Sequence, residues 1–307
     1  MKRTIFYWLA PLVYAAALTI LSGLIPEFGR WYSLSPHRGQ TEALVHGRLA
    51  LSYSPYELQH DLSWSGGGVQ QVWGLGVPFW RVPFELISHA FGRRGFPDRV
   101  AFAVALLLTA RWIMLVLCPT WLERKYSCGE TVQYGSAIGI GNQGNGLQWG
   151  FCTAMLTLSF PAFINLLRSS MSIYEEVLAY VFLYGVVLLA TTIRFIQQPK
   201  LGSWSSLCAA AGFGAFVRPT LLFYGLSTLI VAWISLQKSK KRGCFGFPNR
   251  QWLVGPFLFC LGGALLFVTN WIRFGSGLEF GHRLNLQVGD SLLGSMYATR
   301  FGHPSEN

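Results

Sequence analysis

The stretch HDLSWSGGGVQQVWGLGVPFW, residues 60–80, begins with two side chains that could accept or donate a proton. The carboxylate of Asp61 could act as a general base on a hydroxyl group, with His60 beside it as a further polar contact. The glycines that follow would allow the backbone to approach a ligand closely, and the tryptophans would stack on it. A plainer alternative is that Asp61 only closes a turn through its side chain.

A second candidate base and several candidate cations lie elsewhere in the chain. Glu42 stands in TEALVHGRLAL (41–51), which we predict to form a helix at a membrane surface that ends near Gly47. If such a base activates a hydroxyl group that displaces a phosphate, the reaction also needs a cation that stabilises the departing phosphate group. The residues that we predict to bind the substrate are Arg218, His60, His89, Arg81 and Arg283. A carboxylate among arginines at a membrane surface is the arrangement that sugar transfer from a lipid phosphate requires.

Arg218 is the most distinctive of these cations because it lies in FVRPT, between two short apolar runs. Pro219 interrupts the helix beside it, and an arginine at headgroup depth can hold a lipid phosphate. The alternative is a side chain that extends along the helix to reach the membrane surface. Two further carboxylates, Glu175 and Glu176 in SIYEEVL, open an apolar run, where we predict that they interact with the helix dipole.

The elements that must position these residues are apolar helices. Of the 307 residues, 52% are hydrophobic and 12% are charged, and the mean hydropathy is +0.38. Soluble domains carry about 25% charged residues, so the composition indicates an integral membrane protein. The net charge of +11 does not indicate nucleic-acid binding, because the basic residues form no single stripe. Membrane lipids are a better partner for this charge.

We predict an all-α polytopic membrane protein with about seven transmembrane helices. The predicted spans are residues 5–25, 100–121, 149–167, 173–195, 205–217, 220–236 and 252–272. Residues 205–217 are short for a bilayer, so flanking residues must extend this span. The whole chain, residues 1–307, would form one membrane domain. We expect it to be the N-terminal part of a longer protein, because no span follows residues 273–307.

The lysines and arginines predict the orientation of these spans. Lys2 and Arg3 precede the first span and place the N-terminus in the cytoplasm, so residues 26–99 would form a large extracytoplasmic loop. Within this loop, FWRVPFELISHAFG (79–92) separates apolar from polar side chains at helical spacing and predicts an amphipathic helix on the membrane surface. The loop has no cysteine and the chain has no CxxC pair, so we predict neither a disulfide framework nor a metal site.

Five segments in this order carry a family likeness: EALVHGRLAL, HDLSWSGG, YEE at the start of a span, RPT between short spans, and NWIRFGSGLEFGHR after the last span. Together they resemble the bacterial GT-C glycosyltransferases, specifically the polytopic mannosyltransferase-like proteins that use polyprenyl-phosphate sugars. The similarity covers most of the chain and depends on the order and spacing of the segments. It implies a helical core in the bacterial inner membrane, a periplasmic active site, a polyprenyl-phosphate sugar as donor substrate, and an inverting transfer with its base in the first loop.

The sequence differs from the family pattern in the position of the acidic residue that would act as the general base. Relatives often place an acidic pair soon after the first span, whereas GRWYSLSPHRGQTEALVHGR contains no Asp. We therefore expect the base to be Asp61 or Glu42, and three functions remain open. The chain is a glycosyltransferase, a non-catalytic membrane subunit of an envelope-glycan assembly system, or a transporter or flippase. The acids and arginines of the outward loop favour the first over the third.

Overall fold

The computed structural model describes residues 2–21, 23, 36–54, 62–93, 95–117, 173–197, 199–241 and 250–281. The predicted span 149–167 lies outside these residues, as do Asp61, His60 and Arg283. In the described part of the chain, eight α-helices account for most residues, and two short strands form the only sheet there. The chain is therefore mainly helical, as predicted.

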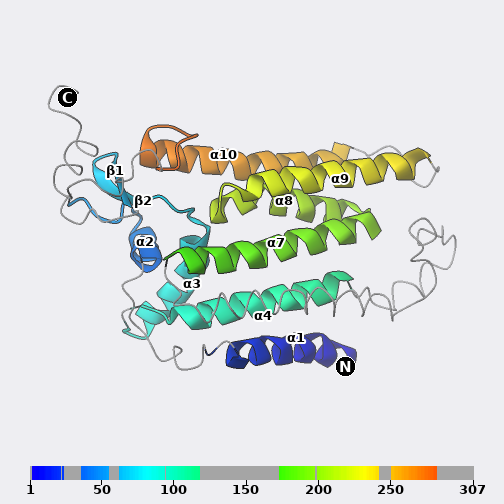
Figure 1. Ribbon diagram of the computed structural model, residues 1–307, viewed down its shortest axis with the longest axis horizontal. Coiled ribbons are helices and arrows are strands. Elements are labelled where there is room, and N and C mark those ends of the chain that lie inside the picture. The colour runs from blue at the N-terminus through cyan, green and yellow to red at the C-terminus, as the bar shows by residue number, and fades with distance from the viewer. Residues whose placement is uncertain are drawn as a thin grey trace.

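Six of the helices run side by side along the long axis of the molecule (Figure 1). They are α1 (Lys2–Leu21), α4 (Asp98–Leu117), α7 (Ile173–Gln197), α8 (Leu201–Val217), α9 (Leu221–Lys241) and α10 (Val254–Phe274). Each coincides with one predicted span to within a few residues, and α8 is extended at its start, as its short apolar run requires. Buried side chains such as Leu18, Phe102 and Tyr180 join α1, α4 and α7.

Two of these helices are candidate membrane spans. Tyr174–Gln197 and Arg250–Phe274 are long and apolar enough to cross a membrane by length and composition. The described apolar parts of α1, α8 and α9 are shorter, at 10–17 residues. The prediction of about seven spans is thus supported only in its coarser form, as a helical protein with two candidate spans.

The outer surface formed by α9 and α10 is apolar. Its exposed side chains include Phe223, Tyr224, Ile230, Trp233, Phe257, Leu265, Val268, Trp271 and Ile272. Both helices pack on α8, and large apolar side chains exposed on a protein surface mark sites of contact with lipid or with another protein. The surface therefore agrees with association of the protein with a membrane.

Glycines allow α8 to approach its neighbours closely. A Cβ atom on Gly262 of α10 would lie 2.6 Å from the carbonyl carbon of Gly212 in α8. A Cβ atom on Gly225 of α9 would lie 2.6 Å from the backbone oxygen of Ala211 in α8. Small residues at helix crossings are typical of helices that pack in membranes, where van der Waals contact between close backbones drives association.

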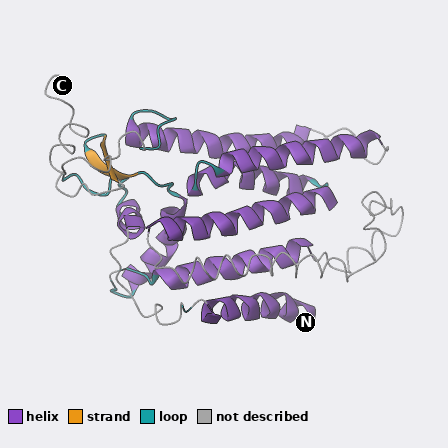
Figure 2. Ribbon diagram, in the orientation of Figure 1, coloured by secondary structure: helices purple, strands orange, loops and turns teal. Residues whose placement is uncertain are grey.

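Residues 36–54 and 62–93 fold over one end of the helical layer, and we call them the end cap (Figure 1, Figure 2). They contain α2 (Pro36–Val45), β1 (Leu62–Ser65), β2 (Gly68–Gln71) and α3 (Gly76–Ala90). The β1–β2 hairpin departs from the all-α prediction. Its turn is made by Gly66 and Gly67, whose φ angles of 61° and 72° are those that a two-residue hairpin turn requires.

The connection from β2 to α3 lies against the C-terminal end of α8. A Cβ atom on Gly76 would lie 2.7 Å from the Cα atom of Val217, and one on Gly74 would overlap the carbonyl oxygen of Phe216. These two glycines of the WGLG sequence therefore serve contact between the end cap and the helical layer. The sequence predicts a different use for them, which is close approach to a ligand.

Candidate functional site

Helix α3 buries its polar face and exposes much of its apolar face. Arg81, Glu85 and Ser88 are buried, whereas Phe79 is 45% and Leu86 is 51% exposed. A helix on a soluble protein turns its apolar face inward, so the reversed arrangement suits a helix whose apolar side contacts lipid at the membrane surface. The predicted amphipathic helix is present, and its polar face is directed into the end cap.

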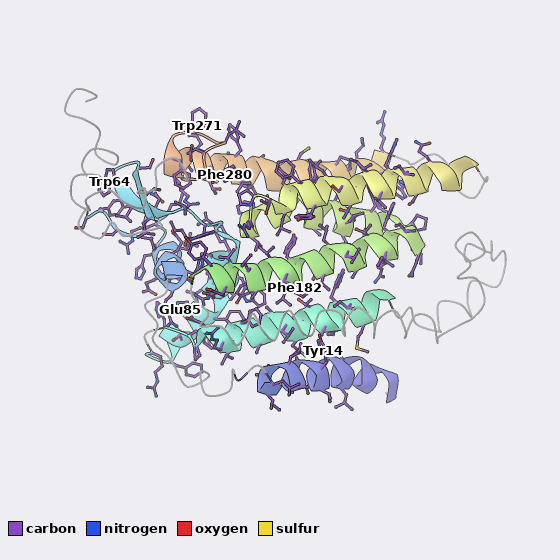
Figure 3. The ribbon with its side chains drawn as sticks, viewed as in Figure 1. Tyr14, Trp64, Glu85, Phe182, Trp271 and Phe280 are labelled. Atoms are coloured by element: carbon purple, nitrogen blue, oxygen red, sulfur yellow. The ribbon has the colours of Figure 1, made fainter. Side chains whose placement is uncertain are left out.

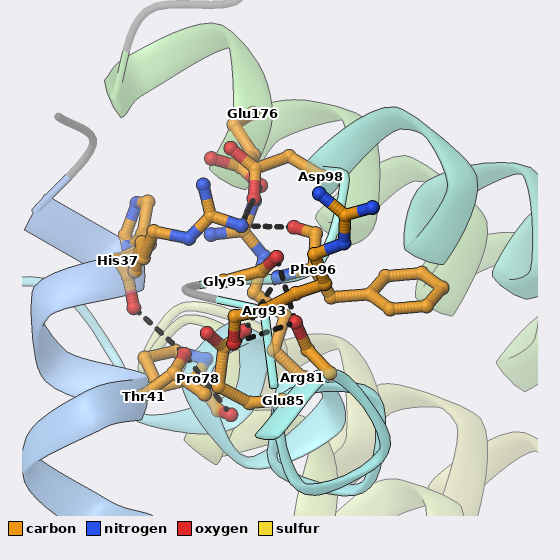
Figure 4. Close-up of polar contacts among 12 residues, drawn as sticks. His37, Thr41, Pro78, Arg81, Glu85, Arg93, Gly95, Phe96, Asp98 and Glu176 are labelled. Atoms are coloured by element: carbon orange, nitrogen blue, oxygen red, sulfur yellow. Dashed lines mark hydrogen bonds and ion pairs between the residues drawn. The ribbon is translucent and has the colours of Figure 1, made fainter. Parts of the chain in front are cut away.

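Arg81 joins three helices through two carboxylates (Figure 4). Its Nη2 atom donates a hydrogen bond to Oε1 of Glu176 in the first turn of α7 and lies 3.0 Å from Oδ1 of Asp98 at the start of α4. Burial by itself lowers the pKa of the Arg81 guanidinium, but the Glu176 and Asp98 carboxylates raise it above its ordinary value. Arg81 thus pairs with two carboxylates that neutralise its charge, and substrate binding by Arg81 stays a prediction.

A second arginine, Arg38 of α2, belongs to the same network. Its Nη2 atom donates to the carbonyl oxygen of Phe96 and lies 3.6 Å from Oδ1 of Asp98. The backbone N–H of Phe96 donates to Oε2 of Glu85 at 3.0 Å. Arg38 and Glu85 thereby fix the chain immediately before α4. Glu176, predicted only to interact with a helix dipole, is part of this buried network, which ties the end cap to α4 and α7.

At the surface of the end cap, Glu42 of α2 meets His89 of α3. Oε2 of Glu42 lies 3.3 Å from Nε2 of His89, and Oε1 of Glu42 lies 3.6 Å from Nδ1 of His46. The side chains of Glu42 and His89 are 40% and 33% exposed, so both are accessible from water. A carboxylate beside a histidine can accept a proton from a hydroxyl group and pass it on. The structure therefore brings together a predicted base and a predicted substrate ligand from two different helices.

Glu42 and His89 also approach Glu85, and these three residues have the spacing of metal ligands. One ligand atom from each lies within 4.8 Å of those from the other two. Imidazole nitrogen and carboxylate oxygen are suitable ligands for Zn²⁺. The sequence predicts no metal site, because the ligands come from two helices whose proximity the spacing of residues does not show. The cluster can thus serve either proton transfer or cation binding.

Arg218 lies where α8 ends. Its side chain is partly buried, and its backbone N–H donates to the carbonyl oxygen of Gly214 at 3.3 Å. The next residue, Pro219, lines a narrow hollow together with Arg273 of α10 and Trp73 of the end cap. The other predicted site residues, Asp61, His60 and Arg283, lie outside the described residues.

Five residues of these sites were not predicted as ligands: Arg38, Glu85, Asp98, Glu176 and Arg273. Glu85 and His89 stand four residues apart on the predicted helix 79–92, and this spacing is the one signal that could have joined Glu85 to the site. Asp98 carries no signal beyond its place at the start of an apolar run. Arg273 is buried at the end of a candidate span, and an arginine within a span is a functional candidate by its cost alone.

Comparisons with protein-family models, with curated proteins and with solved structures find no match to this chain. The functional interpretation therefore depends on the geometry of the end cap and the helical layer.

Proposed function

We propose that this chain is an integral membrane glycosyltransferase that moves a sugar from a polyprenyl-phosphate donor to an acceptor outside the cytoplasm. The observation that carries the proposal is the pairing of Glu42 with His89 at 3.3 Å on the surface of the end cap. The cap closes one end of a layer of apolar helices; Figure 3 shows Glu85 at this end and Tyr14 farther along the layer, on α1. A donor held in the membrane and an acceptor in water would meet at such a boundary.

In the proposed reaction, Glu42 acts as the general base. Its carboxylate accepts the proton of an acceptor hydroxyl while the hydroxyl oxygen attacks the anomeric carbon of the sugar. A new C–O bond forms as the C–O bond to the phosphate breaks, and the polyprenyl phosphate leaves with the electron pair. His89 orients the carboxylate and takes up the proton afterwards. Asp61 is the alternative base, and only the sequence supports this assignment.

The proposal includes about seven spans in a bacterial inner membrane, with the N-terminus in the cytoplasm and the end cap in the periplasm. The apolar surface of α9 and α10 supports contact with lipid, and the lysines and arginines support the orientation. Arg48 is exposed on the cap, and Arg250 is exposed just before α10 begins at Val254, whereas the C-terminal end of α10 lies beside the cap. In a variant without native cysteines, an impermeant maleimide should label Arg48→Cys but not Arg250→Cys in cells with a permeable outer membrane. Labelling of Arg250→Cys alone would contradict this orientation.

Activity is tested with the purified chain in proteoliposomes that contain one polyprenyl-phosphate sugar at a time. The measurement is release of polyprenyl phosphate together with incorporation of radiolabelled sugar into membrane-lipid or glycan acceptors. The wild-type protein should release polyprenyl phosphate from at least one donor. Absence of release with mannose, glucose, galactose and aminoarabinose donors would overturn the proposal.

A second candidate function is a non-catalytic membrane subunit of an envelope-glycan assembly system. It is favoured by the use of Arg81, Arg38, Asp98 and Glu176 in a buried structural network, which leaves few charged groups of the cap for chemistry. Purification with partner proteins, together with no donor turnover by the chain alone, would favour this function over the transferase.

A further inference from the structure

Arg273, in the last turn of α10, is a buried cation. Arg273 is only 2% exposed to solvent. Its Nη2 atom donates to the backbone oxygen of Gln71, and its Cζ atom lies 4.6 Å from the centre of the Phe274 ring. A carbonyl group and an aromatic ring stabilise a guanidinium, but they leave its full positive charge in place.

The other buried arginines of the described chain are neutralised differently. Arg81 and Arg38 both face Asp98, at 3.0 Å and 3.6 Å. No carboxylate of the described residues pairs with Arg273. A buried charge is tolerated when it is paired, so the surroundings of Arg273 call for an anion.

Arg273 faces a narrow hollow between the end cap and the outer end of α10. Other residues that line it include Trp73, Leu75, Pro219, Leu266, Asn270 and Phe280. Within the described chain, the Nε atom of Arg273 has no hydrogen-bond partner. An N–H donor on a buried cation is what an oxyanion would bind, because an unmade hydrogen bond is costly inside a protein.

The surroundings favour an anion that is carried on a lipid. Trp271 and Ile272, the two residues before Arg273, are each 58% exposed on the apolar surface of α10. Figure 3 shows Trp271 and Phe280 close to this end of α10. An alkyl chain lying on that surface would bring its headgroup to the end of the helix, where Arg273 is located.

We propose that Arg273 binds the phosphate group of a membrane lipid at this hollow. The planar guanidinium would donate two hydrogen bonds to phosphate oxygens. This site does not depend on the proposed function, because a lipid phosphate would bind whether or not the chain transfers a sugar. A probe without a sugar therefore tests the site alone, and its result is separate from that of the transfer assay.

The probe is monododecyl phosphate, added to the purified full chain in an uncharged detergent, and binding is measured by calorimetric titration. Arg273→Met should weaken binding by at least about ten-fold, since hydrogen bonds between two charged groups are the strong ones. The matched control is Arg48→Met, which removes an exposed cation of the end cap and should change binding by less than about two-fold. Unchanged binding by Arg273→Met would overturn the proposal.

Thermal unfolding gives a second test, because a ligand that binds only the folded protein raises its unfolding temperature. Monododecyl phosphate should raise the unfolding temperature of the wild type more than that of Arg273→Met. An equal rise in both proteins would overturn the proposal.

Inorganic phosphate distinguishes a lipid site from a site for a free anion. It lacks the alkyl chain that would lie on α10, so it should bind the wild-type protein at least about ten-fold more weakly than monododecyl phosphate. Equal affinity for the two probes would overturn the assignment to a lipid.

Discussion

Replacing Arg81 by methionine should destabilise the protein strongly. The change removes the cation that faces both Glu176 and Asp98, whose side chains are 6% and 21% exposed. Breaking a buried ion pair by removing one partner costs about 3–5 kcal/mol. Asp98 keeps Arg38 at 3.6 Å, so the expected loss of unfolding free energy is near the lower limit, about 3 kcal/mol.

Thermal unfolding of the purified protein in detergent measures this loss. In a chain of this size, a change of one kcal/mol shifts the unfolding temperature by about 2 °C, so Arg81→Met should lower it by about 6 °C. The control Arg48→Met alters an exposed residue and should stay within about 0.5 kcal/mol of the wild type. The double variant Arg81→Met, Glu176→Leu should recover part of the loss, because it also removes the carboxylate left without a partner.

Two results would refute this reasoning. A loss below about 1 kcal/mol, as for an exposed ion pair, would mean that the network of Arg81 is open to water. A double variant that is no more stable than Arg81→Met would mean that the unpaired Glu176 carboxylate is not the source of the loss.

Further predictions concern pH and helix packing. The pKa of Arg81 is raised, so the stability that Arg81 contributes is fully present below the ordinary pKa of arginine. The difference in unfolding temperature between the wild type and Arg81→Met should therefore stay constant from about pH 6 to about pH 10. A difference that shrinks with rising pH would contradict this prediction. Gly262→Ala should cost about 1–3 kcal/mol on thermal unfolding, since its Cβ would meet the Gly212 backbone, whereas Gly263→Ala has open space and should be neutral or stabilising. Gly76→Ala should separate the end cap from α8, seen as faster proteolysis of the cap.

The helices of the layer could be predicted because each contains an uninterrupted apolar run, and hydropathy needs no knowledge of tertiary contacts. The same runs did not establish how many helices cross a membrane, since length and composition mark only Tyr174–Gln197 and Arg250–Phe274. The β1–β2 hairpin was missed because three consecutive glycines, 66–68, obscure the short strands on either side. Two of these glycines make the turn itself.

The sequence identified some residues of the site but not their arrangement. Glu42 and His89 were both selected from the sequence, yet their contact at 3.3 Å depends on how α2 packs on α3. Glu176 was assigned to its own helix because the dipole is a local effect, whereas its partner Arg81 is 95 residues away. Pairings of this kind follow from tertiary structure, which periodicity along one element does not contain.

The most direct test of the central claim is the rate of sugar transfer by Glu42→Gln relative to the wild type. Glutamine keeps the size of the side chain but cannot accept the proton, so the account predicts a loss of at least about 100-fold. The control Glu175→Gln, which changes a carboxylate in the first turn of α7, should retain most of the activity. A Glu42→Gln protein that transfers sugar as fast as the wild type would contradict the account.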